Sequence, residues 1–135
     1  MEFETFKSEH DLEYTPNRIN EDQIDIFEDA VGVSFGRELR RYVVEYGYLA
    51  FGPVEFYGIN SRQMLDSDMV KQSVYLHKYF AKTKGLIAFE NQGDGDYYLV
   101  DGQDHVFEYD SSNDMLIDMK MPLFQYVVTR FQSVK

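Results

Sequence analysis

Nine carboxylates and no lysine or arginine lie between Glu90 and Asp118, in the segment ENQGDGDYYLVDGQDHVFEYDSSNDMLID. Such side chains can exchange protons, bind calcium or pair with the cations of a basic partner. Aromatic residues are interleaved with the acids, whereas a disordered acidic tail would lack them. We therefore expect a folded, negatively charged β surface, which either binds a basic partner or only keeps the protein soluble. The acids are Glu90, Asp94, Asp96, Asp101, Asp104, Glu108, Asp110, Asp114 and Asp118, and the aromatic residues are Tyr97, Tyr98, Phe107 and Tyr109.

Catalysis by a pair of these carboxylates is one alternative, as in glycosidases. Nine acids in one short segment make some close pair almost inevitable. Catalysis also needs a cleft and a shifted pKa. A solvated β face is therefore favoured, and a hydrolase that uses two of the carboxylates stays open as the enzymatic alternative.

Calcium binding is another alternative, because Asp94-Gly95-Asp96 begins like a calcium loop. An EF-hand needs an oxygen ligand at position 5, glycine at position 6 and glutamate at position 12. Turn formation explains these residues more simply. No metal or cofactor is predicted, although the sequence leaves a looser calcium site open. The three required positions hold Tyr98, Leu99 and His105 when counted from Asp94, and Asp114, Met115 and Met121 when counted from Asp110.

The rest of the chain contains no motif that indicates an enzyme. The three histidines, His10, His77 and His105, have no metal-ligand spacing, and no serine lies in a G-x-S-x-G elbow. Cysteine is absent, which excludes disulfides and cysteine nucleophiles. We predict a protein without enzymatic activity.

The composition indicates one domain with a buried core, since 44% of the 135 residues are hydrophobic. The net charge of −11 argues against binding nucleic acid or an acidic membrane surface. The local cluster Arg37, Arg40 and Arg41 fits a solvated helix face. A signal peptide is not recognisable, and no apolar run approaches the roughly 20 residues of a membrane span. We expect a cytoplasmic protein.

Two helices are expected before the first strand. Asn20 has the side chain of an N-cap, and the helix after it should end at Gly32. Ser34 is the expected cap of a second helix, which should end at Gly47. The short link between the two helices predicts a helical hairpin. Residues 1–19 are expected to form an irregular or partly helical lead-in.

The remaining pattern predicts an antiparallel meander, because Asp-Gly turns separate short apolar runs. A central antiparallel sheet with an N-terminal helical hairpin and a C-terminal helix makes the fold class α+β. The expected domain is 1–135, with a core at about 20–131. The expected strands are 48–51, 54–57, 86–89, 97–100, 105–109 and 115–119, with a helix near 66–82 and a last helix after Pro122.

This order of features resembles the SUKH superfamily over about residues 20–131. The resemblance lies in two blocks, Ile26–Tyr57 and Leu86–Tyr109. Many members have a proline at the start of the second helix, where this chain has Ser34-Phe35. The matching positions are Gly32, Gly47, Glu55, Tyr57 and Gly58 in the first block, and Gly93, Asp94, Gly95, Asp96, Tyr97, Asp101 and Val106 in the second.

The resemblance implies an α+β protein without enzymatic activity. Bacterial members are largely immunity proteins that bind a cognate polymorphic toxin, often a nuclease, inside the producing cell. The yeast relatives are cell-wall and signalling regulators, so a regulatory scaffold is the alternative function. Strand residues alternate between faces, so only part of any set can point one way. The expected contacts for a basic toxin surface are Glu55, Asp94, Asp96, Tyr97, Tyr98, Asp101, Asp104 and Glu108.

Overall fold

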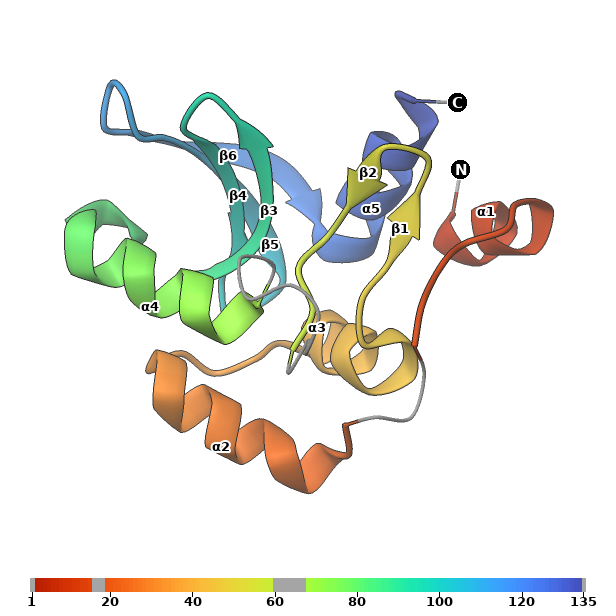
Figure 1. Ribbon diagram of the computed structural model, residues 1–135, viewed down its shortest axis with the longest axis horizontal. Coiled ribbons are helices and arrows are strands. Elements are labelled where there is room, and N and C mark those ends of the chain that lie inside the picture. The colour runs from red at the N-terminus through yellow and green to blue at the C-terminus, as the bar shows by residue number, and fades with distance from the viewer. Residues whose placement is uncertain (1, 16–18, 60–67, 135) are drawn as a thin grey trace.

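The computed structural model describes residues 2–15, 19–59 and 68–134 (Figure 1). It confirms the expected α+β fold with a meander. The elements in chain order are α1 (Phe3–Glu9), α2 (Glu21–Val31), α3 (Arg37–Arg41), the π-helical turn η1 (Tyr42–Tyr46), β1 (Ala50–Phe51), β2 (Val54–Glu55), α4 (Met69–Tyr79), the 3-10 turn η3 (Ala81–Thr83), β3 (Ile87–Gly93), β4 (Asp96–Val100), β5 (His105–Asp110), β6 (Met115–Pro122) and α5 (Leu123–Gln132).

The main sheet has the strand order β3-β4-β5-β6, and every neighbouring pair is antiparallel. The register places Tyr97 opposite Tyr109 and Tyr98 opposite Glu108. Strands β1 and β2 form a separate hairpin. The β3–β4 and β5–β6 turns project at one end of the sheet, and the backbone N–H of Ser111 donates to the carbonyl of Gly95 over 3.0 Å (Figure 1).

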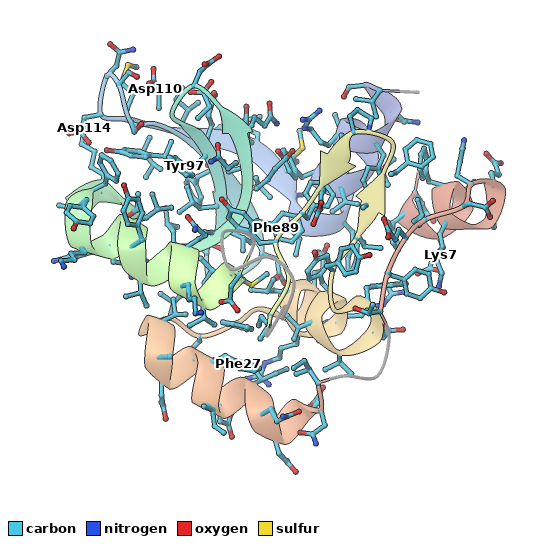
Figure 2. All side chains as sticks on the ribbon, viewed as in Figure 1. Lys7, Phe27, Phe89, Tyr97, Asp110 and Asp114 are labelled. Atoms are coloured by element: carbon cyan, nitrogen blue, oxygen red, sulfur yellow. The ribbon has the colours of Figure 1, made fainter. Side chains whose placement is uncertain are left out.

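Helices α4 and α5 cover opposite faces of this sheet. On one face, Tyr98 stacks on Tyr126 of α5 with ring centroids 5.2 Å apart. On the other, Tyr109 packs against Phe80, which follows α4, at 5.5 Å. Successive strand residues point to opposite sides, so both faces contribute to one core. Figure 2 shows Phe89 of β3 in the middle of the molecule.

The start of α2 follows the sequence prediction. Asn20 and Gln23 form a capping box, and Gly32 ends the helix in a left-handed conformation with φ of 78°. Helix α3 differs from the prediction, because its N-cap is Gly36 rather than Ser34. The helical hairpin is held by Glu28 of α2, whose carboxylate accepts from Arg40 of α3 over 3.1 Å.

Helix α3 continues into the π-helical turn η1 and does not end in a regular α-helical turn. The N–H of Gly47 donates to the carbonyl of Tyr42, five residues earlier, over 3.1 Å. Gly47 has φ of 73°, and a Cβ there would lie 2.6 Å from the carbonyl oxygen of Thr15. Only glycine fits both conditions.

The lead-in contributes to the core more than its sequence pattern suggested. Residues Phe3 to Glu9 form α1, and Phe6 is fully buried. The ring of Phe6 stacks on Phe131 of α5 at 5.8 Å, and Phe3 packs on Phe124 at 4.7 Å. The packed unit therefore begins near residue 3 rather than residue 20.

The helix expected near 66–82 is α4, and residues 66 and 67 lie outside the described residues. The carboxylate of Asp68 caps it by accepting from the N–H of Lys71 over 2.9 Å. The helix ends at Tyr79, before the 3-10 turn η3. In the described ranges, no helix has the length and apolar character needed to cross a membrane.

Candidate binding surface on the acidic meander

Several acids of the meander accept hydrogen bonds within the turns. The carboxylate of Asp101 accepts hydrogen bonds from the backbone N–H groups of Gln103 and His105, each over 2.9 Å. In the β5–β6 turn, Asp110 accepts from the side-chain amide of Asn113 over 2.7 Å, which lowers the pKa of Asp110. These side chains fix the hairpins in the way expected of aspartate at turns.

Asp104 lies inside the protein, where it caps a helix. It is only 6% exposed, and its two carboxylate oxygens accept from the N–H groups of Glu38 and Leu39 over 2.9 and 3.0 Å. A Cβ on Gly36 would lie 2.5 Å from this carboxylate, so the glycine allows the close approach. We therefore correct the expectation that Asp104 contacts a partner.

Glu90 is also buried, with 2% exposure. Its carboxylate accepts from the hydroxyl of Tyr126 over 2.5 Å and from Nε of Arg130 over 3.0 Å. Burial raises the pKa of Glu90, while the hydrogen bond from Tyr126 and the charge of Arg130 oppose that rise. This group joins β3 to α5 and is closed to a partner.

Three of the remaining acids, Asp96, Glu108 and Asp110, lie on one face of the sheet. The register places Asp96 opposite Asp110 and Tyr98 opposite Glu108, so the four side chains point to the same side. Strand β6 continues this face, because Met115 lies opposite Asp110 and Ile117 opposite Glu108. We define the acidic face by six residues: Asp96, Tyr98, Glu108, Asp110, Met115 and Ile117.

The acidic face combines negative charge with a partly exposed aromatic ring. The hydroxyl of Tyr98 donates to Glu108 over 3.3 Å, and burial together with Glu108 raises the pKa of Tyr98 to about 12. The hydroxyl of Tyr98 therefore stays protonated at physiological pH. Met115 is 52% exposed and Ile117 41% exposed, so apolar area borders the carboxylates. Such a surface can pair with cations and supply desolvated contact area at the same time.

The other expected contact residues lie apart from this face. Tyr97 points to the α4 side of the sheet, where burial raises its pKa and Tyr75 adds to the rise. Asp94 is exposed in the β3–β4 turn with φ of 53°. Asp101 lies at the opposite end of the sheet, and Glu55 is exposed on the separate β1–β2 hairpin.

Asp110, Met115 and Ile117 belong to the acidic face but were not among the contact residues expected from the sequence. The turn at residues 101–104 could have identified these residues, because a tight turn fixes the register of β4 against β5. That register pairs Tyr98 with Glu108, and the period of two then adds Asp110 to the same face. The apolar residues of β6 follow from the next turn in the same way.

The cations of α3 border a separate hollow. Arg37, Arg40 and Arg41 line it together with Phe35 and Val44. Two of the arginines are paired with acids, Arg40 with Glu28 and Arg41 with Glu4 and Glu45. Within residues 2–15, 19–59 and 68–134, no group of three or more His, Asp or Glu side chains could hold a metal ion.

A four-stranded antiparallel meander between two helices, preceded by a helical hairpin and a small β-hairpin, defines a single α+β domain. The family model SUKH_5, described as SMI1-KNR4 cell-wall, matches residues 3–130. The chain therefore belongs to this family of the SUKH superfamily. The matched span includes α1, in agreement with its packing on α5. A comparison with curated proteins gives no match.

Proposed function

We propose that this protein is an immunity protein, which binds and neutralises a cognate polymorphic toxin in the cytoplasm of the producing bacterial cell. The acidic face is the observation that supports this proposal most directly. Three carboxylates surround Tyr98 there, and exposed apolar side chains lie beside them. Membership of the SUKH superfamily supports action through a protein partner.

The charge of this face favours a basic toxin surface. Asp96, Glu108 and Asp110 lie on adjacent strands, and the acidic segment contains no lysine or arginine. A nuclease must present cations to bind the phosphates of its nucleic acid. A protein that covers those cations with carboxylates would block substrate access, and its charge would accelerate the encounter.

Binding rather than catalysis is the proposed mode of action. The two most buried acids of the meander, Glu90 and Asp104, are engaged by hydrogen bonds from Arg130, Tyr126 and backbone N–H groups. General acid–base catalysis needs a carboxyl group within reach of a substrate proton. Both groups instead connect structural elements, so we assign them to stability.

A regulatory scaffold for endogenous protein partners is the second candidate function. The description of the matching family as SMI1-KNR4 cell-wall favours it. The same acidic face would then recognise a basic segment of a cellular protein. The two candidates differ in what the partner does to a cell when it is expressed alone.

The test begins with a pull-down from the source cell, followed by expression of each captured protein with and without this chain. An immunity protein restores growth to cells that express the toxin, whereas a regulatory scaffold captures proteins that are not toxic. If no captured protein is toxic, or if the wild-type chain fails to rescue growth, the immunity function is wrong.

The surface is tested with two variants that change the net charge equally. Asp96→Lys with Glu108→Lys reverses the acidic face, and Asp25→Lys with Asp29→Lys changes exposed acids of α2. We expect association of the first variant to slow by about tenfold or more at low salt and to lose most of its salt dependence. The α2 variant should remain close to wild type. Equal association rates for both variants would exclude the acidic face.

A further inference from the structure

Strand β6 is the open edge of the main sheet. It is the last strand in the order β3-β4-β5-β6, and within the described residues it pairs with β5 alone. The other edge is partly covered, because the N–H of Tyr57 donates to the carbonyl of Phe89 in β3 over 2.8 Å. The backbone groups of β6 that face away from β5 are therefore available for pairing with another strand.

The first half of β6 lacks the usual protection of an edge strand. Met115, Leu116 and Ile117 are consecutive and exposed by 52, 37 and 41%. Natural edges are commonly blocked by lysine, proline or a bulge. Here such features occur only further along, where Lys120 has φ of 59° and Pro122 ends the strand. Residues 115–118 therefore form a short, unblocked apolar edge.

The charge around this edge indicates what can occupy it. Glu108 and Asp110 lie one strand away on the face of Met115 and Ile117. Asp114 and Asp118 lie at the two ends of the edge, and Figure 2 shows Asp110 and Asp114 beside the β5–β6 turn. Lys82 and Lys120 pair with Asp114 and Asp118 at 3.6 and 3.7 Å, and Asp114, just before the edge, also accepts from Lys82 at its backbone carbonyl over 2.7 Å and from the hydroxyl of Tyr109 over 2.5 Å. Such exposed pairs contribute little and exchange readily.

We propose that a basic protein partner adds a β-strand to residues 115–118 of β6. This inference rests on the proposed binding function and specifies its geometry. Backbone hydrogen bonds would supply affinity, and apolar side chains of the added strand would pack beside Leu116, on the face of Tyr109. Its arginines would alternate with these apolar residues and lie on the face of Met115 and Ile117, where they are long enough to cross β6 and reach Glu108 and Asp110.

A second copy of this chain is a poorer occupant of the same edge. Pairing of two β6 strands would bring the acids at positions 108, 110, 114 and 118 of both copies together. Each copy carries a net charge of −11, so the contact would be repulsive. A foreign strand that carries lysine or arginine relieves this repulsion. The charge therefore selects a basic partner over self-association.

Two synthetic peptides separate strand pairing from simple charge attraction. The first has about eight residues that alternate arginine and valine, which favours an extended strand. The second replaces each valine with proline, so it keeps the charge but cannot form a β-ladder. We expect the first to bind at least about tenfold more tightly, and to slow hydrogen exchange at alternate amides of residues 115–118.

A pair of matched variants completes this test. Ile117→Lys places a lysine on the edge, and Val74→Lys makes the same change at an exposed residue of α4. Ile117→Lys should abolish the preference for the arginine–valine peptide, whereas Val74→Lys should retain it.

Equal binding of the two peptides without amide protection would overturn strand addition and leave an electrostatic contact through the acidic face. Failure of both peptides to bind would also overturn it, while growth rescue by the whole chain would still test the immunity function separately. Protection of residues 115–118 that rises with protein concentration in the absence of peptide would show self-association instead.

Discussion

At the residue scale, Glu90 shows how burial changes the chemistry of a carboxyl group within an acidic segment. Its oxygens are enclosed by Tyr126, Arg130 and Gln92, which donate hydrogen bonds to it. Desolvation nevertheless raises its pKa above the ordinary value of 4.5. The folded protein therefore holds this proton more tightly than the unfolded chain does.

This shift predicts a pH dependence that the variant Glu90→Gln should lack. The stability contributed by a raised pKa is fully present below pH 4.5 and decreases as the pH rises through the folded-state pKa. The stability of wild type relative to Glu90→Gln should therefore decrease as the pH rises from about 4 to 7. Urea unfolding followed by tyrosine fluorescence measures both proteins. Parallel pH profiles would contradict the raised pKa, and a difference of the opposite sign would mean that the charge of Arg130 dominates.

At the scale of elements, Asp104 joins the β4–β5 turn to the start of α3. Its carboxylate is the acceptor for two N–H groups that the first turn of α3 leaves without an intrahelical partner. The side chain of the N-cap residue itself cannot serve, because that residue is Gly36. A residue 66 positions away from Glu38 thus performs the capping that is normally local.

The variant Asp104→Asn should lower the free energy of unfolding by about 1–2 kcal/mol, because one of the two charge-assisted acceptors becomes an amide. Asp94→Asn is the matched control, since it also removes one charge from a residue with positive φ in a turn. The control should change stability by less than about 0.5 kcal/mol. Equal effects in urea unfolding would mean that the cap contributes nothing beyond the loss of charge.

The contrast between α2 and α3 shows what local sequence can predict about an element. The capping box of Asn20 and Gln23 lies within one turn, so the residue types alone identify the start of α2. The start of α3 depends on a contact with Asp104, which no neighbouring residue indicates. Ser34 was a reasonable local choice, but the tertiary contact determined the outcome.

The same distinction applies to the candidate site. The turns of the meander were predictable because Asp and Gly act on the backbone within a few residues. The burial of Asp104 and Glu90 was not, because their partners come from α3 and α5. The acidic face became visible only when the register assigned each strand residue to one side. The net charge predicts a basic partner, which stays a prediction, and it does not indicate which carboxylates remain exposed.

At the scale of the whole molecule, the charge is distributed unevenly. Among the described residues, Asp96, Glu108 and Asp110 of β4 and β5 share one face of the sheet, and no ion pair neutralises them. The arginines at positions 37, 40 and 41 lie together on α3, beside Phe35. These carboxylates would attract an approaching basic protein to this face of the sheet, which helps to orient the encounter before contact.

The whole molecule also depends on a contact between its two ends. Helix α1 packs on α5. Phe6 is fully buried against Phe131 and Phe51. The first and last helices therefore pack together in one core, although the first residues carry few sequence signals of a core. A helix of this length is not stable alone, so its order comes from these contacts.

Phe6→Ala should lower the free energy of unfolding by about 3–5 kcal/mol, because it leaves a cavity in the core next to Phe131. Ile26→Ala is the control, since Ile26 is 66% exposed on α2 and its loss should cost less than about 0.5 kcal/mol. Urea unfolding of both variants gives the comparison, and a single transition with an unchanged m-value would place α1 in the same cooperative unit as the sheet. A Phe6→Ala protein as stable as the control would mean that α1 adds no stability. The packed unit would then begin at α2, as the sequence alone suggested.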